Sequence, residues 1–227
     1  MNYNKLEQIV SKPRLKRYRI ACNGNKEQAV MLYRLNVALA QFYYPYLSMF
    51  EVALRNAIDV EMRQYFNNAS WLIAENSSNG FAAALAGNGD NYMQHTINKI
   101  SAKYNTRATH LHVMSEVSLG FWTRFFKRSY FRLLRGRPIH IFKNTTAQIQ
   151  RTDVSNILRK IQVHRNRIYH NEPICFLRRA INVTEVESLY VNLESIMQWL
   201  NEDIDQFIQG NETHQNIIHQ IKQLQEN

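Results

Sequence analysis

The recurrence of apolar residues at spacings of three and four restricts the fold of this chain more than any other feature. Within residues 27–44 it predicts a helix with one buried stripe, formed by Val30, Tyr33, Val37, Ala40 and Tyr44. Pro45 has no amide hydrogen and is expected to interrupt this helix. A second helix is predicted from about residue 46 to 66, with an inner face formed by Leu47, Phe50, Leu54, Ala57, Ile58 and Met62.

The same periodicity recurs further along the chain, and no run of residues alternates as a strand of useful length would. Helices are predicted over residues 92–104, 113–134 and 152–170, and from Thr184 to about Phe207, with Gly210 as the cap. Residues 67–91 are polar and rich in glycine around a short alanine-rich piece, which predicts a loop, either alone or with one short helix. The sequence therefore predicts an all-α protein, a helical bundle with additional peripheral helices.

The length of 227 residues and a hydrophobic content of 45% fit one domain with a sizeable core. We predict a single all-α domain over residues 1–227, with a core of roughly 27–208, an N-terminal arm (1–26) and an acidic helical tail (209–227). Neither a membrane span nor a signal peptide is recognised, so a cytoplasmic protein without membrane contact is expected. Cys22 and Cys175 are far apart, which predicts neither a disulfide framework nor a zinc site.

Positive charge is concentrated in the middle of the chain. Residues 99–179 contain 17 basic and 3 acidic side chains, whereas residues 180–227 contain 1 basic and 8 acidic ones. Such a basic block is typical of nucleic-acid binding, and the alternative is a solvated surface that the acidic segment partly neutralises. The aromatic residues of this block are expected in the core. The side chains expected to contact RNA phosphates are Arg124, Lys127, Arg128, Arg132, Arg135 and Arg137.

Residues 165–174, with the sequence RNRIYHNEPI, end the helix predicted over 152–170. At 100° per residue Arg165 lies in the centre of the apolar stripe, where a guanidinium needs a carboxylate, carbonyl groups, a second subunit or a phosphate. Asn166 and His170 share a face, but Arg165 and His170 diverge by about 140°. Distortion of the helix before His170, convergence at an edge of the bundle, or a second copy of the helix in a dimer would bring them together.

This R-N-x-x-x-H element, continued by N-E-P-I, resembles the signature of the Abi-like (abortive infection) proteins of the HEPN superfamily. Residues 50–56 (FEVALRN) are similar to a segment that those proteins carry on an early helix of the bundle. The bare Arg-x4-His spacing also occurs at residues 107–112, 135–140 and 159–164, so Asn166 and the E-P-I sequence distinguish the copy at Arg165. The resemblance covers roughly residues 27–208 and implies a HEPN-like helical bundle.

The resemblance implies a metal-independent endoribonuclease in which a homodimer brings two R-N-x-x-x-H elements together over one RNA strand. His170 would deprotonate the ribose 2′-hydroxyl or protonate the 5′-oxygen leaving group, Arg165 would stabilise the transition state, and Asn166 would orient the phosphate or the imidazole. The expected products are a 2′,3′-cyclic phosphate and a 5′-hydroxyl, and no metal or other cofactor is expected.

Supporting roles are predicted for three acidic and basic side chains near these two segments. Glu51 and Arg55 belong to the FEVALRN segment, and Glu51 is expected to orient either Arg165 or Arg55. The alternative is that Glu51 and Arg55 form a surface pair at i,i+4. Glu172 is expected to hold His170 or Arg167, or else only to lead into the following turn. Arg167 is also among the predicted RNA-binding residues.

A role in phage defence by growth arrest, or as a toxin-like effector, follows from the resemblance. RNA and a second copy of the chain are the expected partners, with an antitoxin protein or a small RNA as further partners. The chief alternative is a non-catalytic RNA-binding module of HEPN-like fold, and a more distant one is a helical protein-interaction module. Salt-sensitive RNA binding without cleavage would favour the first alternative, and no RNA binding would favour the second.

Overall fold

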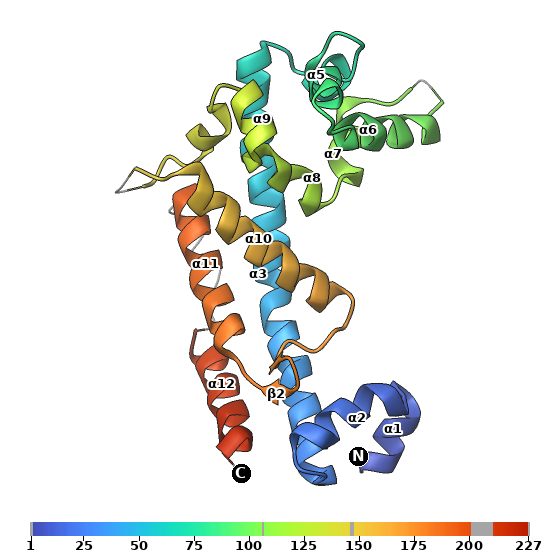
Figure 1. Cartoon of the computed structure of the whole chain (residues 1–227), viewed down its shortest axis with the longest axis vertical. Coiled ribbons are helices and arrows are strands. Elements are labelled where there is room, and N and C mark those ends of the chain that lie inside the picture. Colours follow the sequence, from blue (N-terminus) through green and yellow to red (C-terminus); the bar gives the residue numbers. More distant parts are fainter. Residues whose placement is uncertain (1, 106, 146–147, 201–210, 227) are drawn as a thin grey trace. The chain divides into compact units, whose positions relative to one another are not determined.

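Helices dominate the computed structural model of the chain, which describes residues 2–105, 107–145, 148–200 and 211–226 (Figure 1). The prediction of an all-α protein is confirmed, because the regular structure of these residues is helical except for one short hairpin. None of their helices combines the length and the apolar character needed to cross a membrane. The α-helices are α1 (Tyr3–Val10), α2 (Lys12–Ala21), α3 (Lys26–Phe66), α4 (Trp71–Ala74), α5 (Phe81–Gly87), α6 (Tyr92–Lys103), α7 (His110–Glu116), α8 (Leu119–Thr123), α9 (Arg128–Leu133), α10 (Arg151–Tyr169), α11 (Thr184–Leu200) and α12 (Asn211–Glu226).

Shorter elements connect these helices. The 3-10 helices η1 (Arg124–Phe126) and η2 (Arg137–Ile141) flank α9. Strands β1 (Phe176–Leu177) and β2 (Ala180–Ile181) pair in antiparallel register, with Phe176 opposite Ile181. The sequence pattern did not predict this hairpin, because two residues per strand are too few to show an alternation.

The described residues group into two compact units. The first unit draws on Met1–Met49, Val163–Ser195 and Asp203–Asn227, and the second on Phe50–Gln162 and Ile196–Glu202. Helices α3 and α10 each contribute residues to both units. The expectation of a single domain stays a prediction.

The prediction that Pro45 interrupts the first long helix is wrong. Helix α3 runs through Pro45 without a break for 41 residues. Both Pro45 and Gln41, whose carbonyl loses its helical donor, are exposed, so this carbonyl lies on the side that faces water. On the opposite side, Tyr43 and Leu47 are fully buried, and their burial offsets the missing backbone hydrogen bond.

The predicted buried stripe of the first half of α3 is confirmed for Val30 and wrong for Val37 and Tyr44, because the helix mainly buries a neighbouring face. Tyr44 is 54% exposed and Val37 is 37% exposed, although both belong to the predicted stripe. The predicted inner face of the second half is confirmed for Leu47, Phe50, Leu54, Ile58 and Met62. The residues that the first half of α3 buries are Ala29, Val30, Leu32, Leu35, Asn36, Leu39 and Tyr43.

In the first unit, the predicted N-terminal arm folds into α1 and α2, which lie against the beginning of α3 (Figure 1). Leu15 and Tyr18 anchor α2, since both are almost completely buried. The Tyr18 ring makes edge contacts with Tyr33 and Phe176, at centroid distances of 5.2 Å each. Arg17 adds a stack over Phe176 and donates to the carbonyl of Arg178 at 2.5 Å. The arm is therefore a packed part of this unit.

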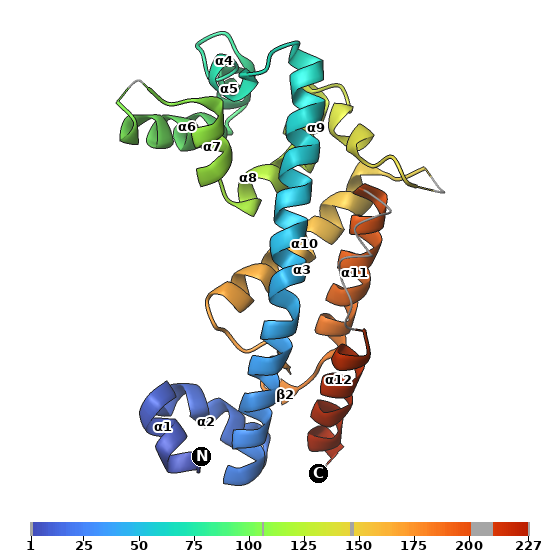
Figure 2. The same ribbon diagram turned by 180° about the vertical axis from the view of Figure 1, so that it is seen from behind.

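At the other end of the chain, α12 lies beside α3 and α11 in the same unit, as Figure 1 and Figure 2 show from opposite sides. The buried His214 of α12 stacks on Tyr190 with a centroid distance of 4.7 Å. The Tyr43 hydroxyl donates to the carbonyl of Val186 at 2.7 Å and accepts from His214 Nε2 at 2.8 Å. The predicted helical tail is helical over its described residues, whereas Phe207 and Gly210 lie outside the described residues.

These contacts predict that acid weakens the first unit. His214 Nε2 carries the proton, and the buried Nδ1 has no hydrogen-bond partner among the described residues. Burial lowers the pKa of His214 below its ordinary value, against the opposing effect of Glu187. As the pH falls, the imidazole therefore gains its second proton in the unfolded chain before it does so in the folded chain. The free energy of unfolding should then fall as the pH falls below about 6.5.

Urea unfolding at pH 7.5 and at pH 5.5 measures this effect. His214→Phe keeps the ring stack and removes the titrating nitrogen, so it is expected to flatten the pH dependence relative to the wild type. An equal loss of stability in both proteins between these two pH values would contradict the prediction.

The second unit contains the segment for which one helix was predicted over residues 113–134. The structure instead divides it into α7, α8, η1 and α9, because Val117 and Lys127 have extended ψ angles of 138° and 149°. Glu51 accepts from the amide of Leu119 at 2.8 Å and so caps α8. The prediction that the aromatic residues of this segment are core is confirmed for Phe121, Trp122, Phe125, Phe126 and Tyr130.

Candidate active site

The C-terminal end of α10 carries the R-N-x-x-x-H element, in the first unit. Helix α10 ends at Tyr169, as predicted, and His170 follows as its C-cap. Asn171 has a left-handed φ of 55°, which asparagine adopts more readily than most residues. Its amide donates to the carbonyl of Ile168 at 3.0 Å, and the amide of Glu172 donates to that of Arg167 at 2.7 Å. These two bonds form a Schellman motif, which determines where the chain turns after His170.

The side chains of Asn166 and His170 are both exposed at this end of the helix. They stand four residues apart, and the amide of His170 donates to the carbonyl of Asn166 at 2.9 Å. The two side chains therefore share a face, as predicted. An exposed imidazole and an exposed amide on one helix face are accessible to the phosphate and the ribose of an RNA strand.

Arg165 lies at the edge of the buried stripe of α10 and not at its centre. It is half-buried, whereas the adjacent His164 is only 3% exposed, so the stripe is displaced toward His164. The guanidinium carbon of Arg165 lies over the ring of Tyr169, 4.1 Å from the centroid. An aromatic ring is a partner that the sequence argument did not consider, and such a cation–π contact contributes about 0.5–1 kcal/mol at exposed sites.

A ring contact connects this arginine to α3. Tyr169 meets Tyr44 edge to face, with centroids 5.1 Å apart. Sequence reasoning missed both tyrosines as site residues. The spacing of Arg165 and Tyr169 at i,i+4 could have indicated the first contact, but the contact with Tyr44 depends on the packing of α10 against α3 within this unit.

A cavity of about 270 Å³ adjoins the end of α10. Glu172, a predicted supporting residue, lines this cavity together with Asn171 and Tyr44. Asn36, another residue of its wall, is only 6% exposed. Its Oδ1 accepts from the amides of Ile174 and Cys175, at 2.8 and 3.2 Å, and so holds the chain that follows the R-N-x-x-x-H element. A polar residue on the apolar face of a helix was the available signal for Asn36.

Arg167, predicted to bind RNA, donates a hydrogen bond to the carbonyl of Pro173. This contact braces the turn that carries Asn171 and Glu172. Its role in RNA binding stays a prediction.

The two supporting residues predicted on the FEVALRN segment belong to the second unit. Glu51 caps α8, and Arg55 donates to the carbonyl of Met114 at 3.5 Å. The i,i+4 spacing of Glu51 and Arg55 continues with Asp59 and Arg63, which form an ion pair at 2.7 Å. Asp59 is buried, however, so this series is not a solvated surface ladder. These two hydrogen bonds of Glu51 and Arg55 hold elements of the second unit together, and the supporting role of both residues stays a prediction.

The other basic residues predicted to bind RNA lie in the second unit, and their environments differ. Arg124 pairs with Asp90 at 3.0 Å and stacks over Tyr92, with its guanidinium carbon 3.7 Å from the ring centroid. Arg137 pairs with Glu61 at 2.6 Å. The remaining four are exposed and form no ion pair with another described residue: Lys127, Arg128, Arg132 and Arg135.

Within the described ranges, no group of three or more His, Cys, Asp or Glu side chains is arranged to hold a metal ion. The two cysteines, Cys22 and Cys175, are both buried and unpaired. Burial raises the pKa of the Cys175 thiol to about 12, so this sulfur stays protonated at neutral pH.

Comparison with known proteins gives one match. A family model described as Abi-like protein matches residues 3–175 of the chain. The matched region includes the R-N-x-x-x-H element and also α1 and α2, which the resemblance seen in the sequence did not cover. No curated protein and no solved structure matches the chain significantly.

Proposed function

The chain belongs to the Abi-like family, and from this premise we propose that it is a metal-independent endoribonuclease of the HEPN type. Membership of the family indicates a role in abortive infection, which is a form of phage defence. The observation that supports the nuclease proposal is the exposed R-N-x-x-x-H element at the C-terminal end of α10, with Asn166 and His170 on one face.

The chemistry follows from the side chains of this element. One imidazole takes the proton of a ribose 2′-hydroxyl, and the 2′-oxygen attacks the adjacent phosphorus. The bond from phosphorus to the 5′-oxygen breaks, and this oxygen receives a proton from a general acid. Arg165 stabilises the negative charge that develops on the phosphate oxygens, and Asn166 orients the phosphate or the imidazole.

The proposed site is composite, formed by two copies of the chain. A regular helix keeps Arg165 and His170 on different faces, and α10 is regular up to Tyr169. A second element from a partner copy would supply the missing group, with one His170 as the base and the other as the acid. A dimeric mass of the purified protein would support this arrangement, and a monomeric, active protein would exclude it.

Cleavage of a labelled RNA in EDTA tests the reaction itself. We expect metal-free cutting that leaves a 2′,3′-cyclic phosphate and a 5′-hydroxyl. A single 2′-deoxynucleotide on the 5′ side of the cut should block cleavage at that position, because it removes the nucleophile. Products with a 5′-phosphate, or cutting at the deoxy position, would refute the mechanism.

A second candidate is a non-catalytic RNA-binding module of the same fold. The observation that favours it is the stack of Arg165 on Tyr169, which engages the guanidinium within one chain. RNA binding that weakens with salt, without any cutting by the wild type, would support this candidate.

A further inference from the structure

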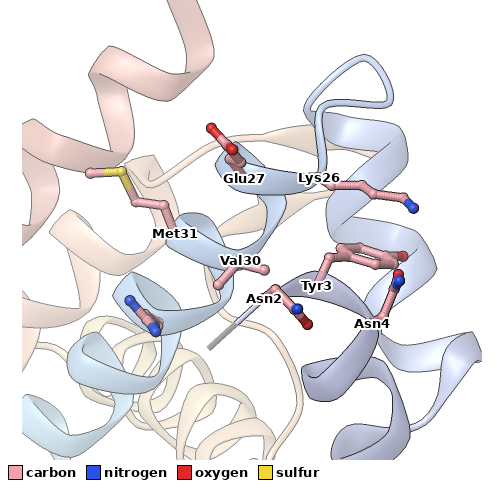
Figure 3. A pocket seen from close by; sticks show the side chains of 8 residues that line it. Asn2, Tyr3, Asn4, Lys26, Glu27, Val30 and Met31 are labelled. Atoms are coloured by element: carbon pink, nitrogen blue, oxygen red, sulfur yellow. The ribbon is translucent and has the colours of Figure 1, made fainter.

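Three cavities follow one face of α3 in the first unit. The largest, about 620 Å³, lies between the start of α1 and the first turns of α3, where Tyr3, Lys26 and Val30 line it (Figure 3). A middle cavity of about 270 Å³ shares Val30 and Arg34 with it. The cavity beside the end of α10 shares Tyr33, Val37 and Gln41 with the middle one. Because each cavity shares lining residues with the next, the three are neighbours along this face, and we call the surface that they line the α3 groove.

The floor of the α3 groove is the apolar face that the sequence predicted to be buried. Val30, Tyr33, Val37, Ala40 and Tyr44 all line one or more of the three cavities. They recur at spacings of three and four and so follow one side of the helix. An apolar face of this kind, left partly exposed on a folded unit, is typical of a binding surface.

The wall of the groove brings positive charge to this floor. Residues 1–26 contain 7 basic and 1 acidic side chains. Arg14, Lys26 and Arg34 line the groove, and Lys26 lies over the Tyr3 ring at 5.4 Å. The groove also contains one accessible aromatic ring, Tyr44, which is 54% exposed. Cations together with an accessible ring are suited to a single-stranded nucleic acid, through phosphates and base stacking.

The cavity at the α10 end also presents a hydrogen-bond donor of fixed orientation. The buried Asn36 uses its Oδ1 to accept two backbone amides. Its Nδ2 group therefore remains as a donor, and it has no acceptor among the described residues. Glu172, an exposed residue with a carboxylate side chain, lines the same cavity. The donor and the acceptor suit the hydrogen-bonding edge of a base, and the exposed Tyr44 ring beside them suits its face.

We propose that a single strand of RNA lies in the α3 groove and leads into the R-N-x-x-x-H element. One base stacks on Tyr44, with its edge toward Asn36 and Glu172, and the strand continues past Arg14 and Arg34. This inference rests on the proposed ribonuclease function, to which it adds the path of the substrate. The N-terminal arm is then a substrate-binding element.

Binding of a fluorescein-labelled 12-nucleotide RNA to His170→Ala protein tests the proposal without cleavage. Tyr44→Ala in this background is expected to weaken binding about 5-fold to 150-fold, the effect of losing one base–aromatic stack. Tyr44→Phe keeps the ring and should restore most of the affinity. Replacing both Arg14 and Arg34 by alanine should reduce the slope of log affinity against log salt by about 1.4, if each contacts one phosphate.

Ile20→Ala and Lys16→Ala are the matched controls, because both residues are exposed on α2 and neither lines the groove. They should leave the affinity within about 2-fold, since single exposed residues outside a binding site have small effects. Thermal unfolding of each variant identifies any loss of fold.

The possible outcomes separate this inference from the nuclease proposal. RNA affinity that depends on Tyr44 supports the groove even if the wild type cuts no RNA. Unchanged affinity in the Tyr44 and arginine variants, with cutting intact, would overturn the groove and leave the nuclease standing. A change of oligomeric mass in Tyr44→Ala, without a change in RNA affinity, would assign the groove to a second copy of the chain and overturn the inference.

Discussion

His170→Ala is expected to reduce metal-free RNA cleavage by about 100-fold to 10,000-fold, the usual contribution of a positioned general acid or base. His170 is exposed and follows the last residue of α10, so its removal leaves no cavity. The backbone bonds of the Schellman motif do not involve its side chain. The variant should therefore unfold at the temperature of the wild type, and the loss of rate can be assigned to chemistry.

His140→Ala is the matched control for this prediction. His140 is also exposed, and it follows Arg135 at the same Arg-x4-His spacing, on η2 in the second unit. Its removal should leave the cleavage rate unchanged. Comparable losses in both variants, or unchanged cutting by His170→Ala, would refute the assignment of His170 as the catalytic residue.

Asp59→Ala is expected to lower the free energy of unfolding by about 3 kcal/mol, the largest stability effect that we predict. The buried Asp59 Oδ1 accepts from Trp71 Nε1 at 2.9 Å and from His110 Nε2 at 2.7 Å. Its Oδ2 pairs with Arg63 at 2.7 Å. Alanine would leave the two buried donors without an acceptor, in a unit whose core contains Trp71.

Urea unfolding followed by tryptophan fluorescence measures this loss. Asp59→Asn is the informative control, since an amide oxygen still accepts from Trp71 and His110 and only the pairing with Arg63 is lost. Arg63 is 38% exposed, so its pair contributes about 1 kcal/mol at most. A loss below about 1 kcal/mol in Asp59→Ala would show that water replaces these bonds at little cost.

The helical class and the helix that carries the candidate site could be predicted from local patterns. The period of 3.6 residues and the proline after the R-N-x-x-x-H element were enough to locate α10 within one residue of its ends. The breaks within residues 113–134 could not be predicted, because Glu51, 68 residues before Leu119, caps the helix that begins there. A cap supplied from so far away in the sequence gives no local signal.

The apolar spacing also could not predict which face of α3 is buried. Two apolar faces alternate on this helix, and both satisfy the same spacing rule. Which of them the core covers depends on α11, α12 and the segment that follows α10 in the first unit, whose contacts with Tyr43 and Asn36 select one face. The other face forms the floor of the α3 groove.

Local patterns in the sequence were enough to show that this chain is helical and that α10 ends at an R-N-x-x-x-H element. They also showed that Asn166 and His170 share a face. These properties follow from neighbours within a few residues. The tertiary structure was needed to show that Pro45 stays inside a helix and that Arg165 stacks on Tyr169 next to Tyr44. It was also needed to show that the basic N-terminal arm lines a groove beside the candidate site. These properties depend on contacts between segments far apart in the chain, which no local spacing records.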